Sequence, residues 1–136
     1  MNPKYNKLEN LFGELFDNMS AHSSTPWQPP TDVYETPEEV VVKMSLPGTN
    51  SEDIKVSFSD DILTVNGTRA DHSSHEKICF YQVEIRYGYF ERSILIPKPI
   101  DTEKVQAIYK EGFLQVTLPK ASQQQSGIFS IKINFT

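Results

Sequence analysis

The sequence predicts an all-β chain that folds as an antiparallel β-sandwich. From residue 32 to residue 118, short apolar runs alternate with polar residues at a period of two. Gly, Pro, Asn and Asp separate these runs at close spacing, and no long helical period lies among them. Short alternating strands joined by tight turns are typical of two packed antiparallel sheets.

The first two strands are expected before residue 47. A short strand is predicted near Val33 and Tyr34, followed by a turn at Thr36-Pro37. The second strand is expected to end at Pro47-Gly48, because Pro and Gly are poor strand residues. Its apolar face consists of Val40, Val42, Met44 and Leu46.

A β-hairpin and three further strands follow. The runs IKVSF and ILTVNGT, joined at Asp60-Asp61, predict the hairpin, with another turn at Asn66-Gly67 or just beyond. The other strands are expected in YFERSILI, VQAIYK and FLQVTL, which are separated by Pro97-Lys98-Pro99 and by Glu111-Gly112.

Residues 70–87, ADHSSHEKICFYQVEIRY, form a connection that is longer than a turn needs. Its second half alternates Cys79, Tyr81, Val83 and Ile85 with other side chains, which predicts a strand. This strand can join the local sheet, or it can pair with an edge strand of a second subunit. The second option would make the protein an obligate dimer.

The two ends of the chain have other patterns. One face of an amphipathic helix is predicted from Leu8, Leu11, Phe12, Leu15, Phe16 and Met19. Residues 20–31 are rich in Ser, Thr and Pro and predict a connector, so the helix is an arm outside the main core.

After the polar run 121–126, the C-terminal tail alternates Phe129, Ile131, Ile133 and Phe135. An unpaired apolar strand promotes aggregation, so we expect a surface that receives it.

Composition limits the function classes. The 136 residues suffice for one domain plus tails, the formal net charge is −5, and no basic run occurs, so nucleic acid is not an expected partner. No signal-peptide core or apolar stretch of about 20 residues is present, so no stable membrane insertion is expected. The single Cys79 agrees with a reducing compartment, and the expected location is cytoplasmic.

Neither catalysis nor a cofactor is expected. The sequence has no Gly-x-Gly-x-x-Gly, no phosphate-binding Gly-Lys-Ser/Thr, and no recognisable nucleophile beside a base, which predicts an ATP-independent protein that is not an enzyme. His72, His75 and Cys79 have residue types that bind zinc. Three ligands in a Ser-rich loop favour solvated histidines and a packing cysteine, so no metal is expected.

Spaced motifs over residues 27–120 resemble the small heat-shock proteins, which are built on the α-crystallin domain. These motifs are Trp27 to Glu35, Leu46-Pro47-Gly48 with Asp53-Ile54, Gly88 to Arg92 with Ile96-Pro97, and Ala107 to Leu114. Beyond them, Ile131-Lys132-Ile133 is similar to the Ile-x-Ile of the family's C-terminal extension. Phe113 stands where the family usually has Val, which implies an enlarged core side chain and local repacking.

The resemblance implies an immunoglobulin-like sandwich with three parts: an N-terminal arm (1–26), an α-crystallin domain (27–120) and a C-terminal extension (121–136). It implies that Ile131 and Ile133 enter a groove on a neighbouring dimer, lined by Ile54, Val56, Phe58, Val105, Ala107 and Tyr109. As in non-animal members, it also implies a dimer in which Tyr81, Val83, Ile85 and Arg86 add to the partner's edge at Val33 and Tyr34. The alternative for the tail is a strand that closes its own sheet.

The expected function is therefore that of a stress-response holdase, which binds partly unfolded client proteins and leaves refolding to ATP-driven chaperones. The arm residues from Leu8 to Met19 are expected to bind clients, or to pack on the domain or inside the homo-oligomer. Two other classes stay open: a co-chaperone-type module that docks one defined partner, and a structural protein like a lens crystallin.

Overall fold

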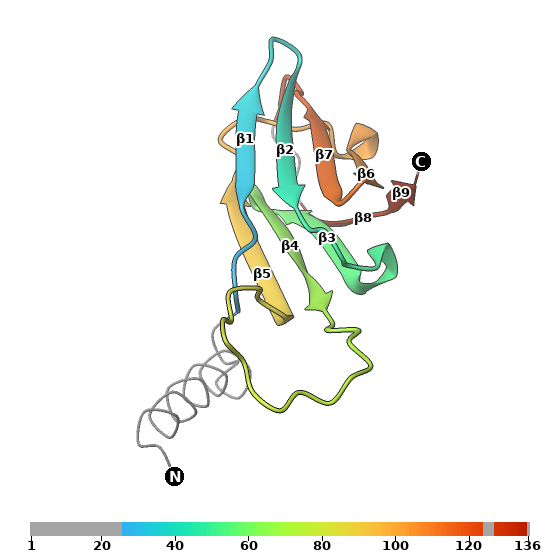
Figure 1. The fold of residues 1–136 in the computed structure, drawn as a ribbon. Helices are drawn as coiled ribbons and strands as arrows, with labels where there is room; N and C mark the ends of the chain where they lie inside the picture. Colours follow the sequence, from blue (N-terminus) through green and yellow to red (C-terminus); the bar gives the residue numbers. More distant parts are fainter. Residues whose placement is uncertain (1–25, 124–126, 136) are drawn as a thin grey trace.

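The computed structural model describes residues 26–123 and 127–135 (Figure 1). Within them the chain forms a sandwich of two β-sheets, which confirms the predicted fold class. The predicted arm helix, from Leu8 to Met19, lies outside the described residues.

Four pairs of strands that follow one another in sequence are also neighbours in a sheet. One sheet, here called the β1 sheet, has the order β1 (Thr31–Glu35), β2 (Glu39–Ser45), β7 (Phe113–Pro119), β6 (Gln106–Lys110) and β9 (Ile133–Phe135). The other, the β5 sheet, has the order β5 (Gly88–Leu95), β4 (Ile62–Arg69), β3 (Ile54–Ser59) and β8 (Ile128–Ile131). The four pairs are β1–β2, β3–β4, β4–β5 and β6–β7. Short 3-10 helices, η1 (Ser51–Asp53) and η2 (Thr102–Lys104), precede β3 and β6.

Two-residue turns close the hairpins β3–β4 and β6–β7. Asp60 and Asp61 have φ of 51° and 66°, and Glu111 and Gly112 have φ of 52° and 82°. Positive φ at both central residues is the geometry that matches the right-handed twist of the flanking strands. Both predicted turns are thereby confirmed.

The core lies between the sheets, and alternate side chains of β3, β4 and β7 are buried in it. Phe90 on β5 is fully buried, and its ring meets the ring of Trp27 edge to face at 5.5 Å between centroids. The core also holds Val42, Met44, Leu46, Leu63, Val65, Ile96, Ile100, Leu114, Val116 and Leu118. Full burial of one such side chain stabilises the fold by about 1.5–3 kcal/mol.

Three details differ from the sequence prediction. Of the two positions predicted for the turn after β4, Asn66-Gly67 is wrong: β4 continues to Arg69, which pairs with Gly88, and the chain leaves the sheet just beyond. Phe113 is 44% exposed rather than in the core; it lies on the outer face of β7, with Lys43 Nζ 4.7 Å from the centre of its ring. Leu114 occupies the core instead.

The third difference is the connection of residues 70–87, which has no strand in the described chain. It leaves the end of β4 and returns to the start of β5 as a wide loop (Figure 1). An alternating segment becomes a strand only when a neighbouring strand satisfies its backbone groups, and this segment has no such neighbour within the described residues.

Candidate functional site

The tail, residues 127–135, lies between the edges of the two sheets. Its first strand, β8, runs antiparallel to β3 and places Ile131 opposite Val56. Its second strand, β9, runs parallel to β6 and places Ile133 opposite Ala107. The tail therefore crosses from the β5 sheet to the β1 sheet (Figure 1).

The six residues predicted to receive the tail lie on β3 and on β6 or directly before it, the two strands with which the tail pairs, and they are here called the tail groove. Ile54, Val56, Phe58 and Ala107 are buried, while Val105 and Tyr109 are partly buried against the same core. Ile131 and Ile133 are themselves partly buried and pack against this core cluster. Lys132 between them is exposed, as expected for alternate residues of a strand.

One polar contact holds a wall of the tail groove in place. The Tyr109 hydroxyl donates a hydrogen bond of 2.5 Å to the carbonyl oxygen of Leu46. Leu46 lies just after β2, and its own amide donates to the carbonyl oxygen of Gly112 at 2.7 Å. The aromatic ring on β6 is thus tied to the turn that follows β2.

The described chain joins the predicted tail to the predicted groove within one molecule. Closure of its own sheets was one of the two arrangements expected for this segment. Phe129 lies opposite Phe58 on the inner side of β8, whereas Ile128 is 79% exposed on the outer side. The tail therefore contributes apolar side chains to both faces of the β5 sheet.

Most of the residues predicted for strand exchange are exposed, and no strand pairing joins the loop of residues 70–87 to β1 within the described chain. Within the described residues, β1 pairs with β2 alone, so its other edge is open. On this edge strand Val33 is 47% and Tyr34 is 50% exposed. In the loop of residues 70–87, Tyr81 is 90% and Ile85 is 61% exposed. Arg86 is also exposed, and Val83 is half-buried.

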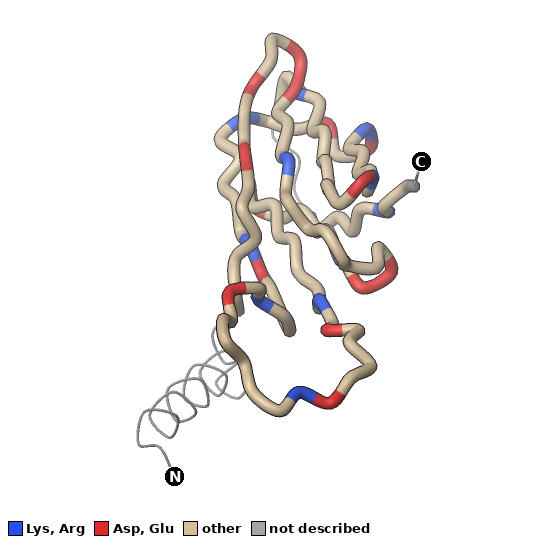
Figure 2. The backbone as a smooth tube through the Cα atoms, in the orientation of Figure 1, with Lys and Arg blue, Asp and Glu red and all other residues tan. Residues whose placement is uncertain are grey.

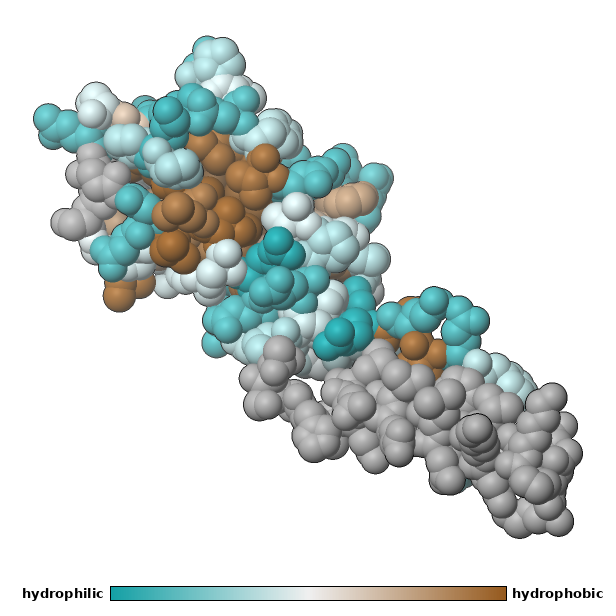
Figure 3. Space-filling model, turned by 90° about the vertical axis from the view of Figure 1, so that its left-hand side faces the viewer, coloured by the Kyte–Doolittle hydropathy of each residue, from teal (hydrophilic) through white to brown (hydrophobic). Residues whose placement is uncertain are grey.

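Hydrophobic atoms gather on the side of the molecule that carries the edge strands β1 and β5. This side lies on the left in Figure 1 and faces the viewer in Figure 3, where it shows a broad brown patch. Val33 on β1 and Leu95 on β5 contribute exposed apolar side chains to these strands, and Leu95 is 62% exposed. Ile62 on β4 lies directly opposite Leu95.

Charged residues are interspersed along the described chain (Figure 2). Acidic residues mark the β1–β2 turn, where Lys120 Nζ lies 3.1 Å from a Glu35 carboxylate oxygen. Within the described residues, no helix has the length and apolar character needed to cross a bilayer.

The loop of residues 70–87 has a local polar network at its start. Asp71 Oδ1 accepts hydrogen bonds from the Ser73 hydroxyl at 2.5 Å and amide at 3.0 Å, and Lys77 Nζ lies 3.2 Å from Asp71 Oδ2. The Ser73 hydrogen bonds first, and then Lys77, lower the pKa of Asp71 to about 2. His72, His75 and Cys79 are exposed in this loop, and the described chain contains no cluster of three such groups placed to hold a metal ion.

Sequence reasoning missed one residue at the base of this loop. Arg69, the last residue of β4, contacts residues at positions 27, 47, 86 and 87. Because these partners are distant in the sequence, no local pattern reveals the contact. The one available signal is a cation at the end of an apolar strand.

The sandwich, its groove between β3 and β6, and the apolar tail strand within it define an α-crystallin type of domain. Residues 32–134 match the model of the Hsp20/alpha crystallin family, and the chain belongs to this family. The predicted family is thus confirmed, and its members are non-enzymatic chaperones, typically oligomeric.

Relatives match along most of their length. The chain is 30% identical over 132 residues to small heat shock protein C2 of Rickettsia felis, a match that covers 93% of this chain and 86% of the relative. It is 36% identical over 126 residues to heat shock protein 16 of Schizosaccharomyces pombe, covering 91% and 88%. The solved structure of heat shock protein 16.0 from Schizosaccharomyces pombe superposes with a TM-score of 0.67 at 33% identity, covering 76% and 81%.

Proposed function

We propose that the protein is an ATP-independent holdase, which binds partly unfolded proteins and prevents their aggregation. The observation that carries this proposal is the shallow docking of the tail. Ile131 and Ile133 pack on the core but remain partly exposed, so their release uncovers an apolar groove at modest cost. A surface that opens reversibly suits a protein that must hold and release non-native chains.

The proposed building block is a dimer that exchanges strands. Tyr81, Val83, Ile85 and Arg86 of one subunit would add to the β1 edge of the other, beside Val33 and Tyr34. The support is that both elements are exposed in the single chain and that β1 has an open edge within the described residues. Pairing would satisfy backbone groups of both and cover the apolar side chains near β1.

The tail would link such dimers by entering the tail groove of a neighbouring dimer. There, Ile131 and Ile133 would make the same contacts that they make in the tail groove of their own chain. Each fully buried isoleucine contributes about 1.5–3 kcal/mol, from which the cost of ordering the tail is subtracted. Single links are therefore weak, and many links hold an assembly by avidity. A related small heat-shock protein from Xylella fastidiosa, with a TM-score of 0.64 at 31% identity, is described as having a distinct high order structure; the match covers 76% of this chain and 94% of that one.

Clients would bind through the apolar stripe of the arm, from Leu8 to Met19. The proposed site of action is the cytoplasm, where ATP-driven chaperones would take over refolding.

The test is an aggregation assay with a heat-labile globular enzyme as client and no nucleotide. The full-length protein should suppress light scattering by the heated client, and a form lacking residues 1–19 should suppress it much less. A control with Glu9→Gln and Glu14→Gln changes only the polar face of the predicted helix and should protect fully. Undiminished protection by the truncated form would refute the role of the arm. A monomeric full-length chain without protection would favour the single-partner module.

A further inference from the structure

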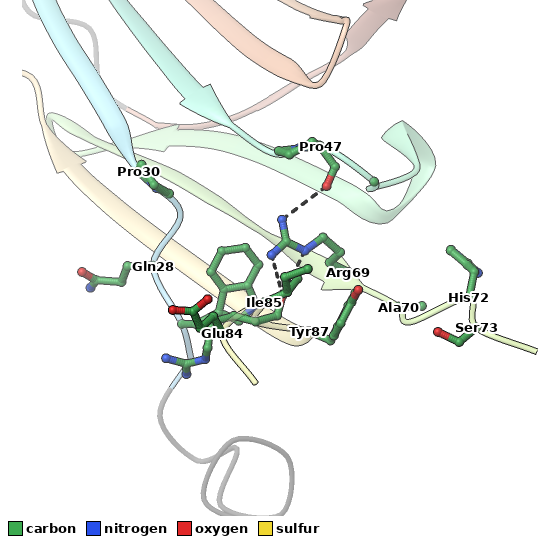
Figure 4. A pocket seen from close by; sticks show the side chains of 13 residues that line it. Gln28, Pro30, Pro47, Arg69, Ala70, His72, Ser73, Glu84, Ile85 and Tyr87 are labelled. Carbon is green, nitrogen blue, oxygen red and sulfur yellow. Dashed lines mark hydrogen bonds between the residues drawn. The ribbon is translucent and has the colours of Figure 1, made fainter. Parts of the chain in front are cut away.

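Arg69 lies where both ends of the loop of residues 70–87 meet the sandwich. Its Nε and Nη2 donate to the carbonyl oxygen of Arg86 at 3.0 and 2.5 Å, and its Nη1 donates to the carbonyl oxygen of Pro47 at 3.3 Å (Figure 4). The planar guanidinium thus bonds at once to the returning end of the loop and to the turn after β2. Lys cannot reproduce this geometry, because its ammonium is a point charge on a flexible stem.

Aromatic rings also contact the same guanidinium. Its Cζ lies 4.3 Å from the ring centroid of Trp27 and 5.7 Å from that of Tyr87. Burial lowers the pKa of Arg69, while Tyr87 and Tyr109 oppose that effect. A cation stacked on aromatic faces and bonded to carbonyl oxygens is held in one orientation.

Trp27 connects this contact to the root of the N-terminal arm. Its indole Nε1 donates to the carbonyl oxygen of Gly88 at 3.3 Å, and its backbone bonds to Tyr89 and Glu91 of β5. Arg69, Trp27 and the loop end line an open cavity of about 780 Å³ (Figure 4). Trp27 therefore lies beside the loop that would exchange.

We propose that Arg69 is the positioning residue of the exchange loop. It fixes the direction in which residues 70–87 leave and rejoin the sandwich, and it links that direction to Trp27 at the root of the arm. The inference rests on the proposed strand-exchange dimer and deepens it. With the loop ends fixed, a second subunit meets a loop that is already oriented, so less ordering is needed on association.

The experiment measures the dimer dissociation constant by sedimentation across dilution. The full-length chain carrying Ile131→Ala and Ile133→Ala serves as the background, because the proposed function expects this form to stop at dimers. Arg69→Gln and Arg69→Lys are compared with Lys98→Gln, which removes one exposed positive charge outside the cavity. Circular dichroism first establishes that each variant is folded.

Arg69→Gln should raise the dissociation constant about tenfold or more, the scale of one lost charged hydrogen bond. Arg69→Lys should raise it as well, whereas Lys98→Gln should not. An unchanged constant in folded Arg69→Gln overturns the proposal. A lysine variant equal to the background overturns the role of the planar guanidinium.

Two further readouts distinguish this inference from the dimer on which it rests. Trp27 is the single tryptophan, so its emission reports on the surroundings of this one side chain, of which the Arg69 guanidinium is part. In Arg69→Gln, emission should shift to longer wavelength, and amide hydrogen exchange in residues 70–87 should speed up. A background protein that stays monomeric would contradict the strand-exchanged dimer. Even in that case, unchanged Trp27 emission and unchanged amide hydrogen exchange in Arg69→Gln would overturn the role of Arg69.

Discussion

Gly67 is a residue whose side chain the fold cannot accommodate. A Cβ at this position would clash with the carbonyl oxygen of Asp53 and lie 2.9 Å from the Phe90 ring. Glycine in a strand interior commonly marks such a close approach. The residue is therefore required by packing across β4 rather than by a turn.

Gly67→Ala should destabilise the protein by about 1–3 kcal/mol, the usual cost of overpacking a core. Urea unfolding followed by circular dichroism measures the change, and Thr68→Ala, which alters an exposed neighbour on the same strand, is the control. If the free energy of unfolding of Gly67→Ala equalled that of the control, the backbone at Asp53 would be able to shift and accommodate the added Cβ without destabilising the fold.

Asp71 makes the conformation of the loop depend on acid. Its pKa in the folded protein, about 2, lies below the usual value of an aspartate, so its contacts stabilise the folded loop fully above about pH 4. They are lost as the pH falls from about 4 toward 2. The Ser73 amide resonance of the folded protein should titrate with a midpoint near pH 2, and Asp71→Asn should abolish that transition. The same titration in the Asp71→Asn variant would contradict the assignment.

The elements that were correctly predicted are those with local signals. The hairpins β3–β4 and β6–β7 follow from period-two alternation and from turn residues within a few positions, such as Asp60-Asp61 and Glu111-Gly112. The end of β4 was left at Asn66-Gly67 or just beyond, because a glycine can mark either a turn or a close approach of another group. Only distant groups such as the Phe90 ring distinguish them.

The loop between β4 and β5 should be removable without loss of the sandwich. Arg69 and Gly88 are paired across the hairpin, so Asn-Gly can replace residues 70–87 and form a two-residue turn. We expect a folded protein by circular dichroism that stays monomeric by sedimentation, because the exchanging residues are gone. Dimers of this shortened form would place the interface elsewhere.

At the scale of the whole molecule, the apolar tail could be recognised because Ile131 and Ile133 alternate after a polar spacer, whereas the residues of the tail groove were implied by the family resemblance. Docking within one chain was one of two arrangements left open, since a strand pattern does not specify which molecule supplies its partner. The contact at Arg69 was equally hidden, because topology rather than sequence spacing brings its partners together.

Ile131→Ala combined with Ile133→Ala should lower the solution mass of the protein to that of a dimer. Light scattering across dilution measures this, and Lys132→Ala, at the exposed position between them, should leave the mass unchanged. An assembly that keeps its mass in the double variant would show that the tail is not the link between dimers.

Docking of the tail in its own groove has a kinetic and thermodynamic consequence for assembly. A segment tethered by a few residues experiences its own groove at an effective concentration of about millimolar, roughly a thousandfold above that of neighbours in a micromolar solution. The tail groove of a neighbouring subunit therefore binds the tail in place of the chain's own groove only after other contacts have brought the subunits together. Assembly should thus rise steeply over a narrow range of protein concentration, with the self-docked tail acting as the competitor that sets this threshold.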